Sequence, residues 1–217
     1  MAHKFAQLMF TEAVQKLQEQ HGSRRQYEKI GKYGPDQEQL GPDETDFIGE
    51  RDSFYMASVG ENDWPYIQHR GGPPGFLYVI DDRTLAFADY SGNKQYITIG
   101  NLQWNNRVTL FLMDYARRVR LKIIGHAEIL DVATDPDLAK KVGSIDPGSK
   151  VERIVRIRIA AFDWNCPQHI TPRYTSEDVQ RAFEPLHEKM ENLQAENEKL
   201  RAALKAASTP QISEREK

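Results

Sequence analysis

Hydrophobic and polar residues alternate along the middle of the chain, in short runs rich in β-branched and aromatic residues. This two-residue period is typical of strands that turn one face toward a core. The predicted strands span residues 54–59, 66–69, 76–80, 85–88, 108–113 and 120–124 and, as one long strand, residues 151–162. The connectors 61–63 and 81–83 are short and turn-like, which favours hairpins and antiparallel pairing. We therefore expect a mainly β (α+β) fold, arranged as a barrel or a sandwich.

Hydrophobic residues three and four positions apart predict helices outside these strands. Residues 5–20 form one amphipathic pattern and residues 94–101 form a short one. Thr45 or Asp46 is expected to cap a short helix ahead of the first strand. Residues 31–42 contain glycine, proline and acids without a period, and they predict a loop.

A heptad repeat follows Pro172, with a seam at Phe183, Leu186, Met190, Leu193, Asn197, Leu200 and Leu204. The leucines at 186, 193 and 200 occupy d positions, and Asn197 occupies an a position, where a buried asparagine favours a parallel pair of helices in register. Glu196 at g is then expected to meet Arg201 at e of the partner helix. Pro185 is expected within the first two turns of the helix. A single helix packed on the barrel is the alternative.

These patterns divide the chain into four parts. Residues 1–45 are an N-terminal helix and loop, and residues 46–173 are the β domain. Residues 174–207 are a C-terminal helix, expected to form a dimeric coiled coil, and residues 208–217 are expected to be disordered.

Charge and cysteine content narrow the function classes. The 217 residues include 29 Lys and Arg against 32 Asp and Glu, a formal net charge of -3, which favours neither nucleic acid nor anionic membrane as a partner. The first ten residues lack the long apolar run of a signal peptide or membrane span. The chain has one cysteine, Cys166, which fits a reducing compartment and is expected to be a small buried hydrophobic residue. We expect a cytoplasmic protein.

Motifs for phosphate loops, metals and hydrolases are missing from the sequence. Residues 71–75 (GGPPG) lack the Lys and Ser/Thr of a P-loop and predict a rigid turn. His69, His126 and His169 lack the i, i+4 spacing of a helical metal site, so no metal is expected. No nucleophile lies in a GxSxG setting.

Cationic residues gather on or beside the predicted strands: Arg70, Lys94, Arg117, Arg118, Arg120 and Lys122. The last three alternate with apolar residues, so they predict a common cationic surface that suits a phosphate. A solvated strand face is the alternative.

Seven short motifs occur in order along the chain: DSFY (52–55), WPYIQHRGG (64–72), FADYSGNKQY (87–96), NL (101–102), LFLMDY (110–115), RLKI (120–123) and WNCPQHI (164–170). Together they resemble the pyridoxamine 5'-phosphate oxidase-related FMN-binding family, over about residues 47–173. The resemblance implies an FMN-binding split β-barrel whose homodimer holds two FMN molecules between its subunits.

The resemblance also implies roles for single residues. Gln68, His69 and Arg70 match the strand that lines the flavin, with Arg70 on the phosphate. Ala88 and Asp89 match the next strand, which approaches the ring or the ribityl chain.

Later motifs extend the implied site. Asn93 and Lys94 match a phosphate-binding pair that is usually Arg-Lys in the oxidases, so one of two positive charges is kept. Arg120 and Lys122 match a strand that reaches the flavin, where one of them is expected to stabilise the reduced ring. Trp164 and His169 belong to the last motif, residues 164–170, and match a closing segment that approaches the flavin of the other subunit.

Two function classes follow. The first is an FMN-dependent oxidoreductase that moves hydride or electrons between a reduced nicotinamide or other donor and a small-molecule acceptor. The second is a non-catalytic flavin-binding or sensing module, and haem or coenzyme F420 is an alternative planar cofactor. Oxidation of vitamin B6 itself is not expected, because the family's oxidases end in a basic strand and this chain continues into the heptad helix.

Overall fold

The protein divides into two units, Met1–Thr171 and Pro172–Lys217. The structure, a computed structural model, describes residues 3–34, 38–92, 94–146, 148, 150–164 and 167–207. The predictions made for Asn93, Cys166 and the tail 208–217 fall outside the described residues.

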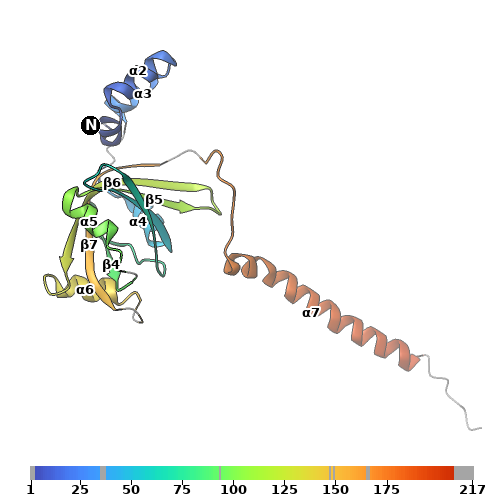
Figure 1. The fold of residues 1–217 in the computed structure, drawn as a ribbon. Coiled ribbons are helices and arrows are strands. Elements are labelled where there is room, and N and C mark those ends of the chain that lie inside the picture. The colour runs from blue at the N-terminus through green and yellow to red at the C-terminus, as the bar shows by residue number, and fades with distance from the viewer. Residues whose placement is uncertain are drawn as a thin grey trace, which may run out of the picture. The chain divides into compact units, whose positions relative to one another are not determined.

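Seven strands of the first unit form one antiparallel sheet in the order β2-β1-β5-β6-β7-β4-β3 (Figure 1). They are β1 (Ser53–Val59), β2 (Pro65–Gly71), β3 (Tyr78–Asp81), β4 (Thr84–Tyr90), β5 (Arg107–Asp114), β6 (Val119–Asp131) and β7 (Val151–Trp164). Because β2 and β3 remain as open edges, the barrel is split rather than closed. The predicted mainly β, antiparallel fold is confirmed.

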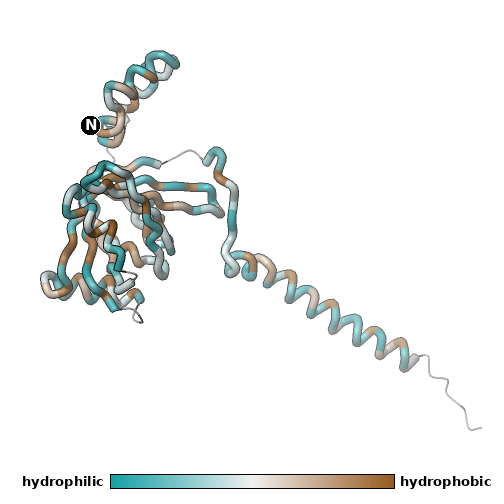
Figure 2. The backbone as a smooth tube through the Cα atoms, in the orientation of Figure 1, coloured by the Kyte–Doolittle hydropathy of each residue, from teal (hydrophilic) through white to brown (hydrophobic). Residues whose placement is uncertain are grey.

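Alternate residues of the strands fill the main core. On β5, Val108, Leu110 and Leu112 are buried, and on β6 Leu121 and Ile123 are buried. Figure 2 shows hydrophobic residues alternating with hydrophilic ones along the strands. The period of two in the sequence is therefore the period with which side chains enter the core.

The central strand β6 is longer than the sequence predicts. Its predicted end at Ile124 is wrong, because the strand continues to Asp131. The register shift at Ile124/Gly125 leaves Ala160 of β7 unpaired, so the alternation changes face in β7 and continues unbroken in β6. The pattern is weak beyond Ile124 because small residues, Gly125 and Ala127, stand at the core-facing positions of β6.

Gly125→Ala is expected to lower the free energy of unfolding by about 1 to 3 kcal/mol. A Cβ at this position would lie 2.5 Å from the carbonyl oxygen of Arg158, in the paired strand, and 3.0 Å from Ile157 Cγ2. Urea unfolding measures the effect. Gly100→Ala is the matched control, since nothing lies within 4 Å of a Cβ added there, and equal midpoints for the two variants would contradict the prediction.

Three helices lie within the first 33 residues, where one helix and the start of a loop were predicted. They are α1 (Lys4–Met9), α2 (Glu12–Gln20) and α3 (Arg24–Tyr33). The predicted single helix 5–20 breaks at Phe10 because Thr11 caps α2, accepting a hydrogen bond from the Val14 N–H at 3.5 Å. The loop predicted over 31–42 begins too early, since α3 extends to Tyr33.

The helix before β1 is α4 (Pro42–Gly49), and its N-cap is Gly41. The Glu44 carboxylate accepts a hydrogen bond from the Gly41 N–H at 2.9 Å. The predicted cap at Thr45 or Asp46 is therefore wrong. Proline at the first helical position had signalled the true start.

Two short helices lie between the later strands. α5 (Ile97–Trp104) starts after the predicted residue 94, because Lys94 and Tyr96 have left-handed φ angles of 59° and 55° that a helix does not accept. α6 (Pro136–Gly143) was not predicted. Asp135 caps it, accepting from the Leu138 N–H at 3.0 Å.

The second unit contains the 32-residue helix α7 (Ser176–Ala207). The Thr175 N–H donates to the Asp178 carboxylate at 3.0 Å, and this bond, with that of the Thr175 hydroxyl, lowers the pKa of Asp178. Since the helix starts at Ser176, Pro185 lies in its interior, and its predicted place in the first two turns is wrong. Among the helices of the described residues, none has the length and apolar character needed to cross a membrane.

Candidate cofactor-binding site

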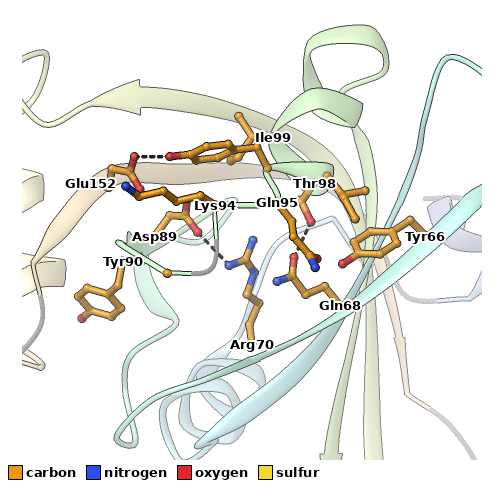
Figure 3. Close-up of a pocket in the computed structure, with 13 residues that line it drawn as sticks. Tyr66, Gln68, Arg70, Asp89, Tyr90, Lys94, Gln95, Thr98, Ile99 and Glu152 are labelled. Atoms are coloured by element: carbon orange, nitrogen blue, oxygen red, sulfur yellow. Dashed lines mark hydrogen bonds and ion pairs between the residues drawn. The ribbon is translucent and has the colours of Figure 1, made fainter.

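A cavity of about 250 Å³ opens between β2, β4 and the start of α5 (Figure 3). Strand β2 contributes Tyr66, Gln68 and Arg70, which alternate along the strand and so share one face. Because β2 is an edge of the sheet and β4 is next to the other edge, the cavity lies at the split of the barrel. The remaining lining residues are Asp89, Tyr90, Gly92, Lys94, Gln95, Tyr96, Ile97, Thr98, Ile99 and Glu152.

An ion pair spans the cavity. Arg70 Nη1 donates to Asp89 Oδ1 at 2.8 Å, and the other Asp89 oxygen lies 3.7 Å from Arg153 Nη1. The side chains of all three residues are at most 17% exposed. Asp89 therefore links the β2 edge to β4 and β7, and its charge is shared between two guanidinium groups.

Several groups that bind anions remain available in the cavity. Arg70 Nε is buried and makes no hydrogen bond, and the Lys94 ammonium makes no hydrogen bond or ion pair within the described residues. The first turn of α5 also lines the cavity, and no N-cap side chain accepts from its N–H groups. Unpaired amides and the helix dipole both favour a negative charge at this point.

Polar side chains fix the opposite wall. The Thr98 hydroxyl donates to Gln68 Oε1 at 2.7 Å, which leaves the Gln68 amide hydrogens for other acceptors. The Tyr96 hydroxyl donates to Glu152 Oε1 at 3.2 Å. Burial, with a smaller effect of the Asp146 charge, raises the pKa of Tyr90, so its hydroxyl stays protonated at neutral pH.

Four of the predicted cofactor residues meet in this cavity: Gln68, Arg70, Asp89 and Lys94. His69 and Ala88 do not line it. His69 points to the outer face of β2, where its ring packs on Tyr55 with centroids 5.5 Å apart. Ala88 is buried in a second cluster with residues of α6.

Arg120 and Lys122 also lie outside the cavity lining. Lys122 pairs with Asp163 at 2.9 Å, and its ammonium lies 4.9 Å from the Phe5 ring centroid. Arg120 has a buried Nε without a hydrogen bond, and its guanidinium lies 5.9 Å from the Phe111 ring centroid. Arg120 and Lys122 share the face of β6 opposite to the buried Leu121 and Ile123, as the alternation predicts, whereas Arg118 belongs to the turn before β6.

The closing segment is placed away from this cavity within one chain. Trp164 donates its indole N–H to Glu44 Oε1 at 2.7 Å and packs edge-on against Phe47. His169 is exposed and has a φ of 64°. Their predicted contact with the flavin of another subunit stays a prediction.

Sequence reasoning missed Tyr66, Thr98 and Glu152. Thr98 was assigned to a helix that was expected to begin at residue 94, so its place in the cavity wall was hidden. Glu152 lies 56 residues from Tyr96, which it contacts. A signal was present for Tyr66, since it shares the two-residue period of Gln68 and Arg70.

The described residues contain no candidate metal site. Over the residues that the structure describes, no group of three or more His, Cys, Asp or Glu side chains is arranged to hold a metal ion.

Two solved structures of known proteins are similar to this chain. HupZ of Group A Streptococcus is 18% identical, with a TM-score of 0.49, over 62% of this chain and 99% of its own. An FMN-binding protein from Syntrophomonas wolfei is 15% identical, with a TM-score of 0.46, over 71% of this chain and 96% of its own. No curated protein matches the sequence.

The family assignment rests on the sequence match to a family model. Residues 41–163 match the model described as pyridoxamine 5'-phosphate oxidase. This range spans more than half of the chain, and it holds all seven strands except the last residue of β7. The chain therefore belongs to the pyridoxamine 5'-phosphate oxidase family.

Proposed function

We propose that this protein binds FMN in the cavity at the barrel split, as a homodimer, and uses it for oxidoreductase chemistry. The observation that carries the proposal is the set of anion-binding groups in that cavity. Arg70, Lys94 and the first turn of α5 converge there from three separate segments. FMN differs from riboflavin by one phosphate, which is the group that such a set recognises.

The charges of the cavity fit this group. Two carboxylates, Asp89 and Glu152, are balanced by Arg70 and Arg153, which contact them. Lys94 adds a positive charge, and no ion pair joins its ammonium to a carboxylate of the described residues. A phosphate bound here gains that charge, the Arg70 guanidinium and the α5 amides together.

The size of the cavity supports a homodimer. At about 250 Å³ it is smaller than the roughly 300 to 1,000 Å³ of typical small-molecule sites. One chain therefore encloses the phosphate and part of the ligand, and a second copy covers the ring.

FMN, when bound, supplies hydride or electron transfer between a donor such as a reduced nicotinamide and an acceptor. The residues of the chain bind and orient it. Arg70 and Lys94 hold the phosphate, and the Gln68 amide group, fixed by Thr98, is placed to donate a hydrogen bond to a carbonyl of the ligand. We do not assign oxidation of vitamin B6, since within the described residues the chain has no strand after β7.

An absorbance spectrum between 350 and 500 nm tests the cofactor, followed by mass spectrometry of the released ligand and anaerobic titration with NADH and NADPH. We expect stoichiometric FMN that loses its absorbance on titration. FMN that stays oxidised with every electron donor tested would instead support a flavin-binding module. A haem or F420 spectrum, or no flavin after reconstitution, would overturn the proposal.

A further inference from the structure

Helix α7 presents a continuous apolar stripe to solvent. Its large apolar side chains are between 45% and 67% exposed. They are Val179, Phe183, Leu186, Met190, Leu193, Leu200 and Leu204. All of them fall at a and d positions of one heptad register, and Figure 2 shows them recurring along the helix.

A stripe of this kind needs a partner surface. An isolated helix in water draws little stability from its own hydrogen bonds, and most helices depend on packing of an apolar face. A shallow groove lies along the stripe, lined by Met190, Leu193, Asn197 and Arg201. Side chains of a second helix fill grooves like this one in knobs-into-holes packing.

We propose that α7 pairs with α7 of a second copy of this chain, as a parallel, two-stranded coiled coil in register. Asn197 is the residue that favours a second α7 as the partner and a parallel orientation of the two helices. In a parallel pair in register, the two Asn197 side chains meet and hydrogen-bond to each other. In an antiparallel pair, Asn197 faces an apolar d residue, and its buried amide lacks a partner.

Charge complementarity favours the same arrangement. In this register, Glu196 at g lies opposite Arg201 at e of the partner, and the pair forms twice by symmetry. Pro185 falls at a c position, away from the seam, so its ring does not enter the contact. Its missing N–H leaves only the Arg181 carbonyl without its helical donor.

Disulfide cross-linking of the full chain tests both pairing and register. Cys166→Ser removes the native thiol, and Leu200→Cys then places the single cysteine in the seam at d. Mild oxidation is expected to convert most of this variant to a covalent dimer, with or without added FMN. Ala202→Cys is the matched control, because this f position points away from the seam, and its dimer yield is expected to be several-fold lower.

Equal dimer yields for the two cysteine variants would overturn the proposal. The absence of a dimer from Leu200→Cys would also overturn it, because an antiparallel pair of helices separates the two residues at position 200.

A second measurement does not depend on a thiol. Leu193→Glu with Leu200→Glu is expected to lower the helical circular dichroism signal and to abolish its dependence on protein concentration. FMN retention by the barrel is read separately, so failure of the coiled coil and failure of the flavin site give different results.

Discussion

Replacement of both Arg70 and Lys94 by alanine is expected to weaken FMN binding by about a hundredfold to ten-thousandfold. Each side chain makes a charge-assisted contact with the phosphate in the proposed complex, and each such contact contributes roughly 1.5 to 3 kcal/mol. Fluorescence titration of the apoprotein with FMN measures the change. Riboflavin, which has no phosphate, is expected to bind the original protein and the variant with similar affinity.

A control variant distinguishes loss of the phosphate site from a general loss of positive charge. Arg25→Ala with Lys140→Ala removes the same two positive charges from exposed helix positions outside the cavity. This variant is expected to keep its FMN affinity. Because Arg70 also pairs with Asp89, thermal unfolding of each apoprotein shows whether the fold is intact. Unchanged FMN affinity in a folded Arg70→Ala, Lys94→Ala variant would refute the phosphate site.

Asp114→Ala is expected to lower the free energy of unfolding by about 3 to 5 kcal/mol. Arg51 Nη1 lies 3.1 Å from the Asp114 carboxylate, and both side chains are about nine-tenths buried. The guanidinium also donates to the carbonyl oxygens of Phe47 and Met113, so it joins the end of α4 to the end of β5. Without Asp114 the Arg51 charge stays buried with no nearby carboxylate except that of Glu50, which is half exposed.

Urea unfolding measures this loss, with Glu61→Ala at an exposed turn as the control for removal of one acid. Asp114→Asn is expected to fall between the two, because an amide oxygen still accepts from the Arg117 N–H at 2.8 Å but carries no charge. If Asp114→Ala unfolds at the same urea concentration as Glu61→Ala, the pair does not hold α4 on the sheet.

The strands of the barrel were predictable because their burial follows a simple rule. Side chains alternate between core and outside, so the sequence period of two gives both the position and the buried face of β1, β5 and the first part of β6. The rule weakens where small residues face the core. Gly125 and Ala127 fill the core-facing positions after Ile123, so no large apolar side chain marked the continuation of β6.

Short helices were harder to predict because local capping, rather than a long apolar stripe, defines them. Asp135 followed by Pro136 is a complete start signal for α6, but the helix has only 8 residues, and three of them, Leu138, Ala139 and Val142, make up its buried face. In α3, the charged segment RRQYEKIGKY buries none of its residues, and its large apolar side chains are only Tyr27, Ile30 and Tyr33.

The site was predictable only in part, because family motifs identify residues and not the face on which each one lies. Residues 68, 69 and 70 were assigned together, and the strand then separates His69 from the other two. Asp89 was expected near the ligand, and its pairing with Arg70 and Arg153 depends on β2, β4 and β7 meeting across the split. Contacts between residues so far apart in the sequence depend on the curvature of the sheet, which no local sequence pattern reveals.

The order of strands in the sheet also bears on how the chain is made. β4 pairs with β3 on one side and with β7 on the other, and β7 lies more than 60 residues further along the chain. During synthesis from the N-terminus, the β3–β4 hairpin therefore leaves the ribosome long before the strand that completes it. Until residues 151–164 emerge, β4 and β6 each keep an open edge, so the nascent barrel is vulnerable to aggregation until its last strand arrives.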